Sequence, residues 1–337
     1  MSKGPTLPPR KARGMRWLVT GGSGFIGSHF VRLVLRERPG LEVVNLDAMT
    51  YAGNAANLLD CEEDPRYRFV RGNICDPAAV EQALAGADAI VNFAAETHVD
   101  RSIAEPDTFV KTDVLGTHVL LQAARTHRIG RFLQVSTDEV YGDVPHGASS
   151  EGDPVRPRSP YAASKASADL LVFAYHATYG VPAMATRGSN TYGPNQFPEK
   201  IVPLFVTNLL DDLPVPVYGD GLQIRDWLFV EDHARAILHV LERGEPGNVY
   251  NVSGETPRTN LELTRILVDR CGRSMTSHVQ HVTDRPGHDR RYAIDSTKLR
   301  ALGWRPRTSF DAGIARTIDW YRENESWWRP LKGPHAK

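Results

Sequence analysis

A hydroxyl and two adjacent carboxyl groups stand together near the middle of the sequence, at Thr137, Asp138 and Glu139. They come just after the apolar run 132–135, which predicts a buried strand. Carboxyl groups are costly to place beside a hydrophobic core unless they are paired or used in chemistry. The position of these three residues therefore predicts a site that transfers protons.

A tyrosine and a lysine follow at a spacing that suits a helix. Tyr161 and Lys165 are four residues apart, so both side chains would lie on one helix face. A nearby ammonium favours the phenolate form of a tyrosine, whose ordinary pKa is about 10. Tyr161 could then act as a base. The alternative is a solvated helix face.

A glycine-rich turn, 21–27, lies between a predicted strand, 16–20, and a predicted amphipathic helix, 28–36. Glycines in such a turn allow a tight bend, close approach of the backbone to a diphosphate, and close packing of the helix on the strand. The N-terminus of the helix then presents free N–H groups to the anion. This arrangement predicts dinucleotide binding by Gly21, Gly24, Phe25, Ile26 and Gly27.

A carboxylate at the end of the next predicted strand, 42–46, indicates which dinucleotide is bound. Asp47 would accept hydrogen bonds from both hydroxyls of a ribose but would repel a 2′-phosphate, so we expect NAD rather than NADP. Beside a nicotinamide, whose positive ring also favours the phenolate, Tyr161 could take a hydroxyl proton while hydride leaves the same carbon. The rest of the predicted cofactor site comprises Asn73, Ile74, Ala94, Ala95, Thr112, Tyr161 and Lys165.

The composition argues against several other classes of protein. The 337-residue chain has 40 basic and 40 acidic residues, so no net charge favours nucleic acid or an anionic membrane as a partner. Its cysteines, Cys61, Cys75 and Cys271, form no C-x-x-C pair, which argues against a disulfide framework and against a metal site. No apolar run has the length of a membrane span or of a signal core. We therefore expect a cytoplasmic protein.

Predicted strands and helices alternate along the first half of the chain, which indicates an α/β fold with a doubly wound parallel sheet, the Rossmann arrangement. We expect this NAD-binding domain at 15–186, after a disordered lead-in at 1–14. One long helix is predicted within it, at 107–127. The pattern from 187 to 330 is less regular and predicts a smaller C-terminal α/β lobe for the substrate, with the chain crossing between the two parts more than once.

The chain resembles a known family from about residue 15 to residue 325. The glycine turn, the Tyr161/Lys165 pair and Val140-Tyr141-Gly142 are similar to those of the extended short-chain dehydrogenase/reductases that modify nucleotide sugars. Epimerases and decarboxylases of that superfamily usually have a small residue in place of Asp138. The segments that resemble the dTDP-glucose 4,6-dehydratases are 46–47, 50–54, 94–103, 137–139, 197–200, 224–227 and 285–292.

The resemblance implies a role for each proton-transferring group in dehydration of dTDP-glucose. Tyr161 would deprotonate the C4 hydroxyl as hydride passes to NAD, while Thr137 or Ser136 could hold that hydroxyl by a hydrogen bond. Glu139 would remove the C5 proton, and a protonated Asp138 would donate to the departing C6 hydroxyl. Hydride would return to C6 and give a 4-keto-6-deoxyhexose nucleotide. The chain would thus be a lyase of deoxysugar biosynthesis that uses tightly bound NAD.

The resemblance also implies where the nucleotide sugar binds. The diphosphate would lie near Asn190, Arg225 and Arg291, since guanidinium groups bind phosphate oxygens at two points. Tyr218 would stack on the pyrimidine, and Arg291 lies in a Gly-Pro turn where we expect no structural role for it. For each residue the alternative is a surface or packing role. The predicted substrate set is Glu96, His98, Asn190, Lys200, Tyr218, Arg225, Asn260, Arg291 and Tyr292.

Four residues depart from the usual dehydratase pattern. Gly188, Thr191 and Asn195 stand where the family more often has Cys, Asn and Tyr, and Asp113 replaces a usual Asn. These departures leave open an unusual hexose or a UDP carrier. The motifs are also compatible with a nucleotide-sugar epimerase or decarboxylase, and with a non-catalytic NAD-binding regulatory protein.

A homodimer is the oligomeric state that the resemblance implies. Its contacts would come from the predicted helices 107–127 and 161–179. The apolar side chains of Leu170, Leu171 and Phe173 would suit such an interface.

Overall fold

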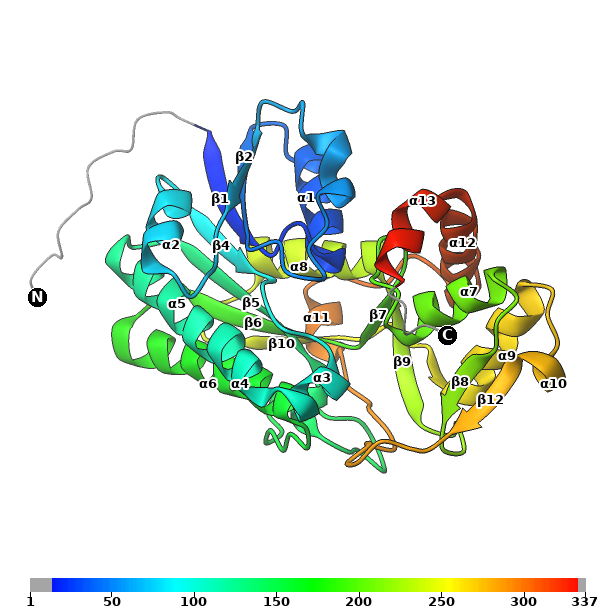
Figure 1. The fold of residues 1–337 in the computed structure, drawn as a ribbon. Helices are drawn as coiled ribbons and strands as arrows, with labels where there is room; N and C mark the ends of the chain where they lie inside the picture. The colour runs from blue at the N-terminus through cyan, green and yellow to red at the C-terminus, as the bar shows by residue number, and fades with distance from the viewer. Residues whose placement is uncertain (1–13, 333–337) are drawn as a thin grey trace, which may run out of the picture.

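A seven-stranded parallel sheet forms the centre of the larger part of the molecule (Figure 1). In the computed structural model, which describes residues 14–332, the strand order is β10-β6-β5-β4-β1-β2-β3. The direction in which the chain adds strands reverses between β1 and β4, so a crevice opens at their carboxyl ends. The predicted doubly wound sheet is confirmed. Its strands are β1 (Met15–Thr20), β2 (Leu41–Asp47), β3 (Tyr67–Arg71), β4 (Ala89–Asn92), β5 (Arg131–Thr137), β6 (Ala183–Gly188) and β10 (Val249–Val252).

Helices cover both faces of this sheet, as parallel strands with two apolar faces require. Within β1, Trp17 and Val19 join the core on one side of the sheet, whereas Leu18 joins the core on the other. The first side is covered by α1 (Phe25–Glu37), α8 (Val230–Arg243) and α11 (Thr297–Ala301). The second side is covered by α2 (Pro77–Leu84), α5 (Thr117–Thr126) and α6 (Pro160–Tyr179).

The smaller lobe has two short sheets and a hydrophobic core of its own. One sheet has the order β11-β9-β7, and the other pairs β12 with β8. The ring of Tyr192 packs against those of Trp227, Phe229 and Phe310 in this core. The strands are β7 (Asn190–Tyr192), β8 (Val215–Tyr218), β9 (Ile224–Phe229), β11 (Pro257–Thr259) and β12 (Val279–Val282). The helices are α7 (Ile201–Leu210), α9 (Asn260–Arg270), α10 (Met275–His278), α12 (Phe310–Glu323) and α13 (Glu325–Trp328).

The chain passes between the two parts several times. β6 belongs to the large sheet and leads almost directly into β7 of the smaller lobe. After β9, α8 returns to the face of the large sheet, and β10 pairs with β6 before β11 re-enters the smaller lobe. Residues 230–252 therefore lie with the large sheet, although they follow residue 187 in the sequence. The assignment of a separate function to each part stays a prediction.

The helix predicted at 107–127 is interrupted. α4 (Pro106–Phe109) continues into a π-helical turn, Val110–Gly116, before α5 begins. The turn accommodates Asp113, whose carboxylate is buried and hydrogen-bonded to neighbouring segments. The prediction of one regular helix is wrong, because the apolar periodicity of a sequence does not register a single widened turn.

The remaining helical segments are short. They are α3 (Val99–Ala104) and 3₁₀ turns at Ala55–Cys61, Asp138–Tyr141 and Arg329–Leu331. Between residues 14 and 332, no helix combines the length and the apolar character that crossing a membrane would need. The lead-in expected at 1–14 lies, apart from Gly14, outside the described residues.

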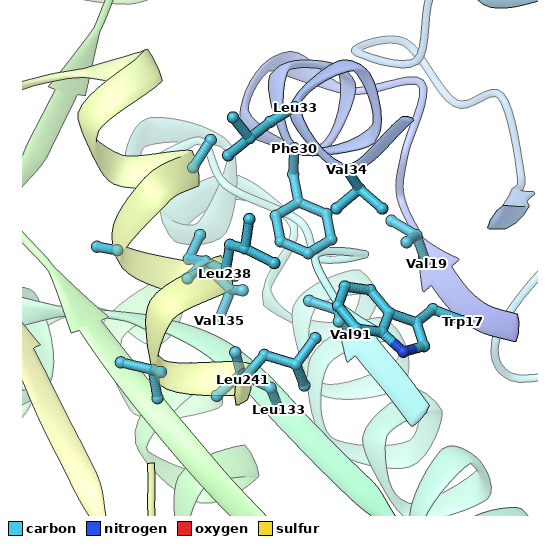
Figure 2. Packing of buried hydrophobic residues seen from close by; sticks show 14 of the residues in the cluster. Trp17, Val19, Phe30, Leu33, Val34, Val91, Leu133, Val135, Leu238 and Leu241 are labelled. Atoms are coloured by element: carbon cyan, nitrogen blue, oxygen red, sulfur yellow. The ribbon is translucent and has the colours of Figure 1, made fainter. Parts of the chain in front are cut away.

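Phe30 of α1 is fully buried among residues of the sheet and of α8 (Figure 2). Its ring stacks on that of Trp17, with a centroid distance of 6.4 Å, and lies 5.2 Å from that of Phe93. Because Phe93 directly follows β4 and α1 follows the glycine turn, this cluster fixes the backbone on both sides of the crevice.

We expect Phe30→Ala to lower the free energy of unfolding by about 3–5 kcal/mol, because loss of the buried ring leaves a cavity under α1. Chemical unfolding followed by circular dichroism would measure the change. Phe69→Ala is the matched control, because Phe69 on β3 is 43% exposed and its loss should cost about 1 kcal/mol or less. Equal losses for both variants would contradict this account of the core.

Candidate active site

A cavity of about 300 Å³ follows the carboxyl edge of the large sheet. The glycine turn lies at one end of it, the ends of β4 and β5 and the start of α6 line its middle, and segments 188–191 and 196–200 border it from the smaller lobe. Open parallel sheets bind ligands at this edge because loops from several strands meet there. All the residues predicted to bind the cofactor, and all those predicted to be catalytic, line this cavity.

The glycine turn leaves no room for side chains at the positions where a diphosphate would approach. A Cβ atom at Gly27 would lie 2.3 Å from the carbonyl oxygen of Gly21, and one at Gly21 would lie 2.6 Å from the backbone nitrogen of Ala94. Gly21 also has a φ of +68°, in the left-handed region that favours glycine. The turn therefore fits the predicted dinucleotide, since the backbone itself forms the wall of the cavity at this end.

Asp47 is held in place at the end of β2 by backbone donors. Its Oδ2 accepts a hydrogen bond from the amide of Ser23 at 2.9 Å, and its Oδ1 accepts one from the amide of Met49 at 2.8 Å. Burial raises the pKa of Asp47, while these two bonds oppose the rise. Each carboxylate oxygen keeps a further lone pair, so Asp47 can still accept a hydrogen bond from a ligand hydroxyl.

Tyr161 and Lys165 lie in the first turns of α6, where both side chains are buried. The helix begins at Pro160 because the hydroxyl of Ser159 caps it by accepting from the amide of Ala162. The ammonium of Lys165 donates to the carbonyl oxygen of Val135 at 2.8 Å, which ties α6 to β5. Burial lowers the pKa of Lys165.

The pKa of Tyr161 lies well above its ordinary value, mainly because the ring is buried and next because Glu139 and Asp113 place negative charge nearby. A hydrogen bond with Thr137 opposes the rise. The expectation that Lys165 and a nicotinamide ring together favour the phenolate stays a prediction. Among the groups of the protein itself, burial of the phenol is the largest effect, and it raises the pKa.

The two adjacent carboxyls have different surroundings. Asp138 is fully buried, its Oδ2 has no hydrogen-bond partner among residues 14–332, and burial followed by the charge of Glu139 raises its pKa well above the ordinary value. Burial also raises the pKa of Glu139, but Arg225, Arg285 and Lys200 oppose that rise. Asp138 is therefore the carboxyl that keeps its proton more readily, in the direction that the sequence predicts.

The predicted substrate residues divide into two groups. Glu96, Asn190 and Lys200 line the cavity. Asn190 Oδ1 is buried without a hydrogen-bond partner in the described part of the chain, and the ammonium of Lys200 donates to the carbonyl of Thr97 at 2.5 Å. The residues outside the lining are His98, Tyr218, Arg225, Asn260, Arg291 and Tyr292.

Arg291 has a structural role, so the expectation that it has none is wrong. Its guanidinium donates to the carbonyl oxygens of Val144 at 2.7 Å and Gly147 at 2.8 Å. These bonds hold the loop that leads from the 3₁₀ turn Asp138–Tyr141 toward α6. Because the partners are backbone carbonyls distant in the sequence, no motif could have indicated them.

Arg225 and Tyr292 support the site from behind. The guanidinium of Arg225 donates to the carbonyl of Asp289 at 2.9 Å and lies over the ring of Tyr292, 4.1 Å from its centroid. The Tyr292 hydroxyl donates to Asp289 Oδ2 at 2.8 Å and lies 3.4 Å from Glu139 Oε2. The structure therefore connects both residues to the carboxyl group of Glu139.

The other three residues of this group lie at edges of the site. His98 is partly buried, and its Nδ1 caps α3 by accepting from the amide of Arg101. Tyr218 is 38% exposed, and its ring meets that of His288 edge to face. Asn260 is partly buried at the start of α9, where its backbone amide donates to the backbone carbonyl of Gln223.

Three further residues at the cavity were not assigned a role from the sequence. Glu199 lines the cavity and accepts from the Tyr51 hydroxyl at 2.9 Å. His233 of α8 also lines it, and its Nδ1 lies 2.7 Å from the Thr191 hydroxyl. Asp113 lies just behind the residues that line the cavity. In the sequence it stands out only because the dehydratases usually have Asn at this position. Glu199 stands within the segment 197–200 singled out above, whereas nothing in the sequence indicated His233.

A family of known enzymes matches both parts of the molecule. The family model for GDP-mannose 4,6-dehydratase matches residues 18–317, from β1 into α12. The chain belongs to this family. Because the match extends over both parts, it includes every segment that lines the cavity.

The described residues contain no group of three His, Cys, Asp or Glu side chains suited to hold a metal ion.

Individual relatives of the family are similar over nearly the whole chain. A dTDP-glucose 4,6-dehydratase from Streptomyces niveus is 54% identical over 325 residues, which cover 95% of this chain and 96% of the relative. The crystal structure of dTDP-glucose 4,6-dehydratase from Streptomyces venezuelae, with NAD and dTDP bound, has a TM-score of 0.92 and 54% identity, and covers 94% of this chain and 100% of that one. A Thermus thermophilus UDP-glucose 4-epimerase in complex with NAD has a TM-score of 0.85 and 34% identity, and the match covers 92% of this chain and 100% of that one.

We expect Asp138→Asn to stabilise the protein increasingly as the pH rises from about 4 to 8. The pKa of Asp138 is raised in the folded state, so the unfolded chain loses this proton first and folding of the wild type becomes less favourable as the pH rises. Asparagine carries no charge at any of these pH values. Thermal unfolding across the range would show a growing advantage in Tm for the variant.

Asp269→Asn is the control for this experiment, because Asp269 is exposed on α9. Its Tm should follow that of the wild type at every pH. A wild type that is more stable than Asp138→Asn at pH 8 would show that the carboxylate form of Asp138 is favoured in the folded state.

Proposed function

We propose that this protein catalyses the NAD-dependent dehydration of dTDP-glucose to dTDP-4-keto-6-deoxyglucose. The observation that carries the proposal is the pair Asp138 and Glu139 beside Tyr161, because a buried carboxyl with a raised pKa next to one that faces cations is an acid/base couple. The dTDP-glucose 4,6-dehydratases at 54% identity and the NAD and dTDP in the Streptomyces venezuelae structure support the same reaction.

The glycine turn and Asp47 would hold NAD. Gly21, Gly24 and Gly27 would admit the diphosphate to the N-terminus of α1, and Asp47 would accept from the hydroxyls of the adenosine ribose. Bound NAD would supply a hydride acceptor for the first half of the reaction, a hydride donor for the second, and a positive charge beside the tyrosine.

Tyr161 is the proposed base for the C4 hydroxyl of the sugar. Because burial and nearby carboxyls raise its pKa, the phenol needs positive charge close by before it can give up its proton. Lys165 supplies part of that charge from the same face of α6, and Thr137 can hold the hydroxyl in hydrogen-bond contact. Loss of the proton from the C4 hydroxyl and of a hydride from C4 gives a ketone, which acidifies the neighbouring C5–H bond.

Elimination of water would use the two carboxyls. Glu139 would accept the C5 proton, while Asp138 would donate its proton to the C6 oxygen as the C6–O bond breaks. The Tyr292 hydroxyl near Glu139 Oε2 and the guanidinium of Arg225 would keep Glu139 oriented. As hydride returns to C6, Glu139 would return its proton to C5. Tyr161 would then still carry the proton of the C4 hydroxyl and Asp138 would lack one, so transfer of a proton from Tyr161 to Asp138, through solvent, would restore both starting states.

The two parts of the molecule would divide the work of binding. Residues 15–186 would hold the cofactor, and the lobe formed mainly from 187–330 would hold the nucleotide sugar through Asn190, Lys200 and Arg225. Asn190 and Lys200 both line this cavity. The unpartnered Oδ1 of Asn190 could accept from a ligand hydroxyl, and the ammonium of Lys200 favours a negatively charged group.

A nucleotide-sugar epimerase is the second candidate, because the Thermus thermophilus UDP-glucose 4-epimerase shares the fold at 34% identity. Epimerisation at C4 needs only the redox step and no acid for a leaving hydroxyl. Asp138 and its raised pKa therefore favour dehydration.

A cytoplasmic location is also proposed, since the three free cysteines suit a reducing compartment.

A homodimer is proposed through the π turn and α6. Val110 and Leu170 are each 58% exposed and Leu115 is 45% exposed, and these two elements pack side by side. Leu171 and Phe173 pack partly against the core beneath the sheet, so Leu170 is the main contact residue of the three considered. Exposed apolar side chains gathered on one surface favour burial by a second copy.

Incubation with dTDP-glucose and NAD, followed by mass spectrometry and NMR of the nucleotide sugar, tests the proposed reaction. We expect a 4-keto-6-deoxyglucose product, and a product that keeps its C6 hydroxyl would contradict dehydration.

Tyr161→Phe should reduce turnover by about 100-fold or more while NAD still binds, because only the proton acceptor is lost. Tyr179→Phe, at the exposed end of α6, should retain activity.

Leu170→Asp should convert the proposed dimer into a monomer, because an exposed carboxylate would have to be desolvated in the interface. Light scattering coupled to size-exclusion chromatography would measure the mass. Leu59→Asp is the control, since Leu59 is 60% exposed on the 3₁₀ turn after β2, away from α6. A monomeric wild type, or a dimeric Leu170→Asp, would contradict this interface.

A further inference from the structure

Asp113 is a buried carboxylate that the proposed reaction does not use. It lies in the π-helical turn between α4 and α5 and is only 1% exposed. Its Oδ1 accepts from the amide of Glu96 at 2.9 Å, and its Oδ2 accepts from the hydroxyl of Ser164 at 2.6 Å. One side chain thus joins the end of β4, the π turn and α6 at the place where all three meet the cavity.

The charged groups that face Asp113 come from three segments. α6 contributes Lys165 and Tyr161, both of which are electrostatically coupled to Asp113. The segment after β4 contributes Glu96, and the loop after β3 contributes Cys75. The adjoining elements carry Lys111, exposed on the turn itself, Asp107, exposed on α4, and His118 of α5, whose Nδ1 lies 3.0 Å from the Tyr175 hydroxyl.

Burial is expensive for a carboxylate, so Asp113 needs its partners. Desolvation raises its pKa to about 6, although Lys165, Ser164 and the amide of Glu96 all oppose the rise. Asp113 is therefore ionised over most of the neutral and alkaline range. Its negative charge raises the pKa of Lys165, against the effect of burial, and also raises the pKa of Tyr161.

We propose that Asp113 is a positioning residue that fixes the Glu96 segment against α6 and whose negative charge sets the pH range over which the Tyr161–Lys165 pair is active. It keeps Lys165 in the ammonium form in a buried site, where the lysine would otherwise lose its proton more easily. The same charge shifts proton loss from Tyr161 to higher pH. Asp113 thus moves both the acidic and the alkaline pH limit of activity to higher pH.

Asp113→Asn tests this inference, which rests on the proposed function because it is read from turnover of dTDP-glucose. Asparagine keeps the shape and can still accept from the Glu96 amide, but it carries no charge. The acidic limb of kcat/KM reports Tyr161 and the alkaline limb reports Lys165. We expect both limbs to move to lower pH by about one unit, since a neighbouring charge changes a pKa by that order. Asp107→Asn, exposed on α4, should leave both limbs in place.

A role in packing alone would lower kcat without moving either limb, and that result would overturn the proposal. Absence of turnover in the wild type would instead overturn the proposed function. A second readout needs no turnover: because folding raises the pKa of Asp113 from 3.8 to about 6, the wild type should lose Tm relative to Asp113→Asn as the pH rises through that interval. A difference in Tm that stays constant with pH would also contradict the inference.

Discussion

The bond between the ammonium of Lys165 and the carbonyl of Val135 is the interaction on which the arrangement of the site depends. It fixes the start of α6 against β5, so the phenol of Tyr161 on the helix lies near the carboxyl and hydroxyl groups at the strand end. An ammonium can be buried here because it has a carbonyl acceptor and two carboxylates, Asp113 and Asp169, in its field. The residues proposed to be catalytic are thus held against the core of the sheet.

Burial of charge recurs around this bond and explains the electrostatics of the site. Desolvation is the largest cause of the pKa shifts of Asp113, Asp138, Glu139 and Tyr161, and it raises each of them. The carboxyls among these groups therefore keep their protons to higher pH than they would in water, and the phenol of Tyr161 loses its proton less readily. A cavity of this kind suits a reaction in which protons must be given and taken in turn.

The crossings of the chain bring a second set of residues to the same edge. β6 leads into β7, which carries Asn190 to the cavity, and α8 returns to place His233 behind Gly188. A Cβ atom at Gly188 would lie 2.5 Å from the His233 ring, so a larger residue at this position would have to displace the side chain of a residue far away in the sequence. The two parts therefore form one site, and neither could line the cavity alone.

The sequence by itself determined the parallel sheet, the glycine turn and the five catalytic candidates, because these depend on local periodicity and on short spacings such as that of Tyr161 and Lys165. Only the tertiary structure decided the direction of the Tyr161 pKa and the structural bonds of Arg291, since desolvation and backbone partners depend on segments distant in the chain. It also decided the place of Asp113, which looks like a minor substitution in the sequence. In the fold its carboxylate is buried between three segments, where charge has its largest effect.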